Sequence, residues 1–247
     1  MGRNRKRGFL LALLIGFDEK HILGWKVYSH SLRPYNNIIM PRKWKYLDEK
    51  QQYKLFEDLV DFIRPMIKQG LKSILLAEEG KLNISDDFIE HVNKHHRWLI
   101  KGRNRISFGK IKGLANTLES AQTLLTREDS SNIIEETVSE ELNQLSQKLE
   151  MLINTGDPKE LLIYNLEGIE NLVFEGGKKD VSAAENLELI ILTESYLENR
   201  RHKNRVHRLL QIAQNKGVKT KIISKESPEA ASFNRLGGIL AFKKDWK

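Results

Sequence analysis

The sequence of 247 residues contains no cysteine and no long hydrophobic run. The absence of cysteine excludes disulfide bonds, cysteine-ligated zinc sites and thiol catalysis, and it is typical of proteins in a reducing compartment. No apolar stretch reaches the roughly 18 residues that a membrane-spanning helix requires. We therefore expect a soluble cytoplasmic protein that has no membrane partner.

The N-terminus has two features of a secretory signal peptide and lacks the third. A basic stretch that contains Arg3 and Arg5 precedes the apolar segment 8–16, GFLLALLIG. However, no small-residue cleavage site follows this segment, and Asp18 and Glu19 come almost directly after it. We interpret segment 8–16 as a buried strand behind a basic tail.

Signatures of catalysis and nucleotide binding are missing as well. The segment FEGGKKD, residues 174–180, contains a Gly-Lys pair but lacks the spaced glycine and the Ser/Thr of a phosphate-binding loop. The predicted core strands carry no carboxylate that could hold magnesium, and the adjacent Glu78 and Glu79 point to opposite faces of a strand. We expect a protein that is not an enzyme and that needs no cofactor.

Histidine is the remaining candidate for metal binding. His91 and His95 have the i, i+4 spacing of two zinc ligands on a helix, and His96 follows them. No third ligand of a suitable type lies nearby in the sequence, and the surrounding positive charge opposes a metal cation. We therefore expect the three histidines to extend a basic face, and we expect no metal site.

The formal net charge of +8 is unevenly distributed along the chain. Residues 1–46 contain ten Lys/Arg against two Asp/Glu, and residues 94–112 contain seven Lys/Arg and no acid. Residues 128–150, in contrast, contain seven acids and one lysine. A single charged run is often no more than a solvated face, but two basic patches beside an acidic helix indicate a polyanionic partner such as RNA.

The first basic region includes a segment, MPRKWKY (residues 40–46), in which basic and aromatic residues are neighbours. Arginine and lysine neutralise phosphates, and tryptophan stacks on unpaired bases. The alternative is that Trp44 belongs to the core, as aromatic residues near strand ends commonly do. The residues predicted to bind RNA or the ribosome are Arg3, Arg5, Arg42, Lys43, Trp44, Lys45, Arg103 and Arg105.

The first half of the chain has the pattern of a mixed sheet with helices. Two β-prone segments enclose the turn FDEK and predict a hairpin. Asp48 and Ser85 are placed to cap helices, and Pro65 is expected to kink or end the first of them. The predicted strands are 8–16, 21–28, 37–40 and 71–79, with one or two more at 98–100 and 106–108, and a further helix is predicted near 112–127.

The second half begins with a polar junction at residues 127–132, followed by a long helix with apolar residues at helical spacing from Val138 to Leu152. Strands that alternate with helices of ten or more residues predict an α/β/α sandwich. We therefore predict an α/β protein of two domains, residues 1–128 and 129–247. The predicted elements after the long helix are strands 160–164, 187–193, 218–223 and 238–243 and helices 166–175 and 203–216.

Taken in order, these elements resemble the central and C-terminal domains of Pelota, the ribosome-rescue relative of the archaeal and eukaryotic class-1 release factors. The loop that begins with Pro41 and Arg42 is similar to the basic loop after the third central strand of Pelota. The resemblance implies an RNase H-like mixed sheet in the central domain. Further similar segments are LKSILLAEEG (71–80), RISFGKIKGLANTL (105–118), IYNLEGIENLVFEGG (163–177), NLELIILTES (186–195) and KGVKTKIISKESPEAASFNRLGGILAF (216–242).

The resemblance implies a ribosome-associated factor that acts by binding, in ribosome rescue, recycling or mRNA surveillance. The implied partners are ribosomal RNA, a translational GTPase of the elongation-factor-1A type and the recycling ABC-family ATPase, and DNA is not among them. The resemblance also places a partner-binding surface at the last strand. Its residues are Gly237, Gly238, Ile239, Leu240 and Phe242. The alternative is that this strand is buried on both faces.

The sequence departs from the family pattern at Trp44, where a basic residue is expected, and at Asn165, where glycine is usual, and two larger departures bear on function. It lacks the Gly-Gly-Gln tripeptide of release factors, which argues for the Pelota branch and against peptide release. Only a short basic segment stands where Pelota has its N-terminal domain, so we expect either another subunit in that role or a repurposed protein. The alternative functions are a protein-binding adaptor with no ribosome role and an RNA hydrolase that would use Asp18 or Glu78.

Overall fold

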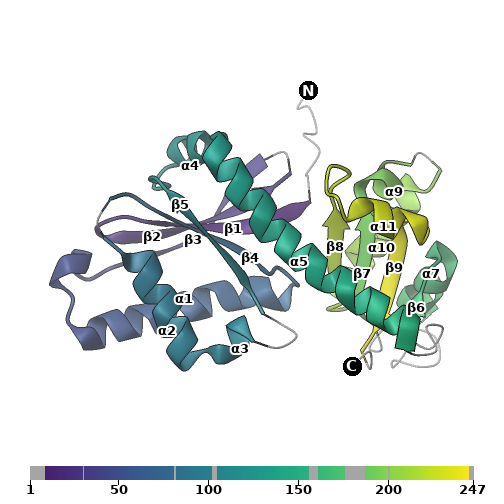
Figure 1. Ribbon diagram of the computed structural model, residues 1–247, viewed down its shortest axis with the longest axis horizontal. Coiled ribbons are helices and arrows are strands. Elements are labelled where there is room, and N and C mark those ends of the chain that lie inside the picture. Colours follow the sequence, from purple (N-terminus) through teal and green to yellow (C-terminus); the bar gives the residue numbers. More distant parts are fainter. Residues whose placement is uncertain are drawn as a thin grey trace. The chain divides into compact units, whose positions relative to one another are not determined.

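The computed structural model describes residues 9–29, 31–80, 82–101, 105–155, 161–175, 187–199 and 201–244 (Figure 1). The chain divides into two compact units, one of residues 1–67 and 71–141 and the other of residues 68–70 and 142–247, so that the main division falls inside helix α5 (Glu128–Thr155). The predicted boundary between residues 128 and 129 lies at the beginning of this helix. The helix runs on from one unit into the next because its sequence contains no glycine or proline.

The first unit is built on a five-stranded mixed sheet in the order β3-β2-β1-β4-β5. Strands β1, β2 and β3 form an antiparallel meander, and β4 and β5 run parallel to β1. Strands β1 and β4 are buried on both faces, which explains their nearly continuous apolar sequences. The strands are β1 (Leu10–Phe17), β2 (His21–Tyr28), β3 (Ser31–Ile39), β4 (Ser73–Glu78) and β5 (Ser107–Lys112).

Helices cover both faces of this sheet. In Figure 1, α1 and α2 lie on one side of it and α4 on the other. Leu59 and Ile63 of α1 share a core cluster with Leu13, whereas Leu124 of α4 shares the opposite cluster with Leu14. The helical elements are η1 (Trp44–Tyr46), α1 (Glu49–Lys68), α2 (Ile84–His95), α3 (Arg97–Ile100), α4 (Leu118–Leu125) and the first half of α5.

Several details of this unit differ from the sequence predictions. Pro65 does not end α1, which continues to Lys68. Proline has no N–H, so the carbonyl of Asp61, four positions earlier, loses its helical hydrogen bond. The helix tolerates this loss because Asp61 is exposed. Ser85 does not cap α2, because its backbone N and its Oγ both donate to the Glu78 carboxylate, at 3.1 and 2.6 Å. Residues 98–100 belong to the short helix α3 and not to a strand.

The second unit contains a four-stranded mixed sheet in the order β6-β9-β7-β8. Strand β7 is parallel to β8 and antiparallel to β9. Helices α7 and α10 share one core cluster with β7 and β9, while α11 lies in front of the sheet in Figure 1. The elements are β6 (Leu162–Ile163), α7 (Leu166–Glu175), β7 (Leu187–Thr193), α9 (Glu194–Glu198), α10 (Lys203–Asn215), β8 (Lys219–Ile223), α11 (Ala230–Arg235) and β9 (Ile239–Lys243).

The predicted fold class is therefore confirmed, with two α/β units and a mixed sheet in each. The apolar spacing predicted for the long helix is also present, since Leu142, Leu145, Leu149 and Leu152 are all buried. Within the described part of the chain, no helix is both long enough and apolar enough to span a bilayer.

Candidate nucleic-acid interface

The loop between β3 and α1 is held against the β1–β2 turn by backbone hydrogen bonds. Met40 N donates to Lys20 O at 2.8 Å, and Trp44 N donates to Glu19 O at 3.0 Å. The loop then enters η1, where Leu47 N donates to Trp44 O at 3.0 Å. These bonds fix the backbone of residues 40–47, so that the side chains of the loop project from defined positions.

Trp44 anchors this loop from the inside. Its side chain is only 6% exposed, and its ring centroid lies 5.4 Å from that of Phe56 in the core between the sheet and α1. The predicted role of Trp44 as an RNA-contacting residue is therefore wrong, because a buried indole offers no face to a base. Tyr46, which is 61% exposed, is the aromatic side chain that the loop displays.

The three basic side chains of the loop are not equally available. Arg42 and Lys45 are exposed, and Lys45 Nζ lies 4.9 Å from the ring centroid of Tyr46. Lys43 forms an ion pair with Glu19. The hydrogen bond between them lowers the pKa of Glu19 and raises the pKa of Lys43 from their ordinary values. The loop thus presents the exposed cations Arg42 and Lys45, neither of which forms an ion pair with another described residue, while the charge of Lys43 is already matched.

A second basic and aromatic group, not predicted from the sequence, lies on the β2–β3 hairpin. Lys26 and Arg33 are register partners on the two strands. Lys26 Nζ lies 4.7 Å from the ring centroid of Tyr35, and the Arg33 guanidinium lies 5.7 Å from that of Tyr28. The sequence does carry a signal for this group. In each of the two strands a basic residue and a tyrosine stand two positions apart, and residues at this spacing share one face of a sheet.

This hairpin group belongs to an open edge of the sheet. Strand β3 is the terminal strand, and Arg33 on it is exposed. Arg33 precedes Ile39 by six positions, so about 20 Å of strand separates the hairpin group from the basic loop. The first unit therefore carries two sets of basic and aromatic side chains at opposite ends of the same hairpin.

The second basic stretch, residues 94–112, is partly neutralised. Arg105 forms an ion pair with Glu140 at 3.1 Å, and Lys110 forms one with Asp86 at 2.7 Å. A contact of Arg105 with RNA would have to compete with Glu140, and that role stays a prediction. The predicted residues Arg3, Arg5 and Arg103 lie outside the residues that the structure describes.

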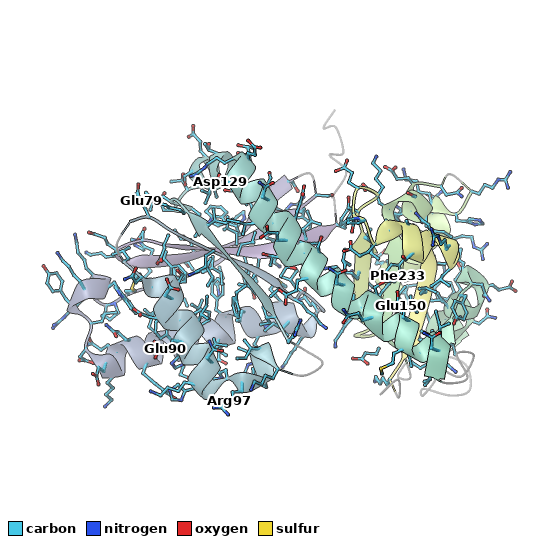
Figure 2. All side chains as sticks on the ribbon, viewed as in Figure 1. Glu79, Glu90, Arg97, Asp129, Glu150 and Phe233 are labelled. Atoms are coloured by element: carbon cyan, nitrogen blue, oxygen red, sulfur yellow. The ribbon has the colours of Figure 1, made fainter. Side chains whose placement is uncertain are left out.

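The same stretch displays an aromatic ring that the sequence analysis did not select. Trp98 of α3 is 44% exposed, and the guanidinium of Arg64 lies 5.8 Å from its ring centroid. Its neighbour Arg97 is exposed at the outer edge of the unit, as Figure 2 shows. These three residues combine an accessible ring with cations, as single-stranded RNA binding requires.

The predicted partner-binding strand, β9, is not accessible. Ile239, Leu240 and Phe242 are each at most 1% exposed, and β9 is paired with β6 on one edge and with β7 on the other. The prediction that these three side chains contact a partner is therefore wrong. The cause is the central position of β9, which buries both of its faces and both of its edges.

The two glycines before β9 have a conformational role. Gly237 and Gly238 have φ values of +99° and +76°, which side chains rarely adopt. Gly238 N donates to Phe233 O at 3.0 Å, and a Cβ built on Gly238 would lie 3.2 Å from the Cβ of Tyr196. Gly238 is buried and shapes the turn into β9. Gly237 is exposed, and its contact with a partner stays a prediction.

The carboxylates that a hydrolase would use are engaged in hydrogen bonds. Asp18 Oδ1 accepts from the backbone N of Lys20 and of His21, both at 2.7 Å. Glu78 accepts from Ser85. Asp18 closes the β1–β2 turn and Glu78 holds the start of α2, so both have structural tasks.

The three histidines do not form the expected basic face. His95 is exposed, but His91 is buried, and burial lowers its pKa from the ordinary value. His91 and His96 both donate a hydrogen bond to Glu57 of α1. Glu57, His91 and His96 lie close enough together to hold a metal ion. Within the described ranges, no other group of three or more His, Cys, Asp or Glu side chains does so.

Comparisons with known proteins identify a family and a fold. Residues 81–244 match the family model described as eRF1 domain 3. The fold is similar to a chain of the ribosome-bound assembly of archaeal Pelota and ABCE1, with a TM-score of 0.52, 15% identity and coverage of 98% of this chain and 63% of that chain. It is also similar to S. cerevisiae Dom34, with a TM-score of 0.50, 16% identity and coverage of 98% and 66%.

Dom34 is a translation termination-like factor that is involved in RNA quality control pathways and interacts with Hbs1. This chain spans less than two thirds of the length of either similar protein. No curated protein matches it in sequence.

Proposed function

The chain belongs to the family described as eRF1 domain 3, that of the translation factors eRF1 and Pelota, and on this basis we propose that it is a Pelota-like factor that binds the ribosome. Its proposed tasks are ribosome rescue, recycling or mRNA surveillance. The observation that carries the proposal is the family match over residues 81–244. The protein acts by binding and without peptide release, in keeping with a sequence that contains no Gly-Gly-Gln.

The charge distribution of the first unit supports RNA as the binding target. Arg42 and Lys45 project from a loop whose backbone is fixed, and Tyr46 beside them offers an exposed ring. Cations that neutralise phosphates release bound counterions, and an exposed ring stacks on an unpaired base. The loop 41–46 is therefore the proposed ribosome contact, and the hairpin group of Lys26 and Arg33 is a second, separate one at the other end of the hairpin.

We extend the proposal to two protein partners. S. cerevisiae Dom34 interacts with Hbs1, and archaeal Pelota has been described on the ribosome together with ABCE1. The corresponding partners of this chain are a translational GTPase of the elongation-factor-1A type and an ABC-family ATPase. Since Ile239, Leu240 and Phe242 of β9 are buried, the contacts must come from other residues, and the exposed Gly237 is the remaining candidate of the predicted set.

A non-catalytic role is part of the proposal. Asp18 and Glu78, the two carboxylates that an RNA hydrolase would use, each accept hydrogen bonds, Asp18 from the backbone of the β1–β2 turn and Glu78 from Ser85 at the start of α2. Carboxylates held in this way support the fold, and the proposal assigns them this structural task.

The proposal is tested by using an antibody to purify the untagged chain from native cells together with the molecules bound to it. We expect ribosomal proteins and ribosomal RNA to co-purify, together with a GTPase or an ATPase of the proposed classes. Treatment with nuclease should release the ribosomal components. Complexes that survive nuclease treatment and contain no ribosomal component would instead identify the chain as a protein-binding adaptor and refute a ribosome role.

A further inference from the structure

Helices α1 and α2 bring together three side chains with the donor atoms of a metal site. Nε2 of His91 lies 2.9 Å from Oε1 of Glu57, and Nε2 of His96 lies 2.8 Å from the same oxygen. All three ligand atoms lie within 4.8 Å of one another. Glu57 precedes His91 by 34 positions in the chain, so the group exists only in the folded protein.

The packing of the two helices fixes the three side chains. The ring centroid of His91 lies 5.3 Å from that of Phe56 and 5.0 Å from that of Tyr53, so aromatic rings of α1 contact it on two sides. His96 follows the last turn of α2, where its backbone N donates to Val92 O at 2.9 Å. Ligands held by such packing need little rearrangement to bind an ion, which favours affinity.

Exposure decides how an ion would reach the group. The side chains of His91 and His96 are 6% and 11% exposed, whereas that of Glu57 is 38% exposed. The imidazoles therefore form the inner wall and the carboxylate forms the opening. Lys94 and Arg97 are exposed, so solvent and salt screen the repulsion that they exert on a cation.

The geometry points to a binding site for one divalent transition-metal ion of the zinc class, formed by Glu57, His91 and His96. Two imidazole nitrogens and one carboxylate oxygen suit Zn²⁺, Co²⁺ or Ni²⁺ and not the all-oxygen preference of Mg²⁺ or Ca²⁺. Tetrahedral ligands at about 2.0–2.1 Å from zinc stand about 3.3 Å apart. The two observed separations are a few tenths of an ångström shorter, as expected of hydrogen bonds that an ion would replace. Water would occupy the fourth position at the open side.

Cobalt binding to the purified chain tests this site directly. The protein is prepared without a polyhistidine tag, stripped with a chelator and titrated with Co²⁺. We expect one equivalent to bind and to produce the intense visible absorption of a four- or five-coordinate ion. Zn²⁺ should displace the cobalt. X-ray absorption of the zinc-loaded wild-type protein should show nitrogen and oxygen ligands at about 2.0–2.1 Å with the scattering of two imidazoles.

Matched variants assign the ligands. Glu57→Gln and His96→Gln are each expected to weaken cobalt binding by more than about 100-fold, because even the loss of an outer-shell partner costs about 10–100-fold. His207→Gln, which alters an exposed histidine of α10, should leave binding unchanged. Circular dichroism confirms that each variant is folded.

Two results would overturn the assignment. The first is a wild-type protein that leaves the spectrum of aqueous Co²⁺ unchanged, which would show that the three residues form only a hydrogen-bonded cluster. The second is a folded Glu57→Gln protein that binds cobalt as the wild type does. Both results are independent of ribosome binding, because the titration uses the purified chain alone.

Discussion

At the scale of single residues, Trp44 and Tyr46 stand two positions apart and have opposite environments. Trp44 packs against Phe56 in the core, while Tyr46 is 61% exposed. The short helix η1 turns one ring inward and the other outward. The sequence reveals that the loop is basic and aromatic, but not which ring is buried, because that depends on the packing of α1 against the sheet.

The environment of Trp44 predicts the effect of removing it. Trp44→Ala should lower the free energy of unfolding by about 3–5 kcal/mol, since it leaves a large cavity in the core. Tyr46→Ala should change it by less than about 0.5 kcal/mol, because its side chain is exposed. Urea denaturation followed by circular dichroism measures both. Equal effects of the two substitutions would contradict the assignment of Trp44 to the core.

Gly238 permits a second comparison between matched residues. Gly217 and Gly238 both have φ of +76°, but a Cβ on Gly217 would meet nothing within 4 Å, whereas one on Gly238 would meet Tyr196. Gly217→Ala should therefore cost about 1–2 kcal/mol of unfolding free energy, which is the strain of the left-handed backbone. Gly238→Ala should cost clearly more. Urea denaturation of the two variants tests this, and an equal loss would show that the Tyr196 contact relaxes freely.

At the scale of elements, the start of α1 has a reciprocal cap that orders the end of the basic loop. Gln51 N donates to Asp48 Oδ1 at 2.8 Å, and Asp48 N donates to Gln51 Oε1 at 3.2 Å. This is the capping-box arrangement, with an acid and an amide in its two positions. The predicted cap at Asp48 is confirmed, because the sequence pattern and the local geometry coincide within one helical turn.

Removing the cap should weaken the first unit by a modest amount. Asp48→Ala is expected to lower the free energy of unfolding by about 1 kcal/mol, since it leaves helix N–H groups without a partner. Asp58→Ala, an exposed position in the middle of the same helix, serves as the control and should cost less than about 0.5 kcal/mol. Thermal denaturation distinguishes them. If both variants melt together, the side-chain cap contributes nothing measurable.

The strands and helices that were predicted well are those with strong local patterns. Strand β7 and helix α7 have the predicted bounds, because an apolar run between polar segments and a helical apolar spacing are both local signals. Helix α3 was missed because four residues are too few for a periodicity. The accessibility of β9 was misjudged, because the position of a strand within its sheet follows from pairing between distant segments.

The basic loop should be the most salt-sensitive element in ribosome binding. The double variant Arg42→Ala/Lys45→Ala is expected to weaken ribosome binding and to reduce the slope of log affinity against log salt by about two, one for each lost phosphate contact. Its melting temperature should stay unchanged, since both side chains are exposed. Co-sedimentation over a series of salt concentrations measures the slope.

The control for this variant removes the same charge elsewhere. Lys225→Ala/Arg235→Ala alters two exposed residues of the second unit and should leave the salt slope unchanged. If the two double variants weaken binding equally, net charge alone accounts for the attraction, and the loop is not a specific contact.

At the scale of the whole molecule, the order of the elements was more informative than any single motif. The order of strands and helices carried the resemblance to Pelota, and residues 81–244 match the family of eRF1 domain 3. Relations between distant segments could not be predicted in the same way. The approach of Glu57 to His91 and His96 and the pairing of Arg105 with Glu140 depend on how segments far apart in the sequence pack.

The central claim is that this chain binds ribosomes through electrostatic contacts. The measurement that tests it most directly is sucrose-gradient sedimentation of the purified chain with ribosomes from its own organism, at low and at high salt. We expect the chain to migrate with the ribosomes at low salt and to return to the top of the gradient at high salt, because the phosphates regain their counterions. A chain that remains at the top of the gradient at low salt would show that it does not bind ribosomes.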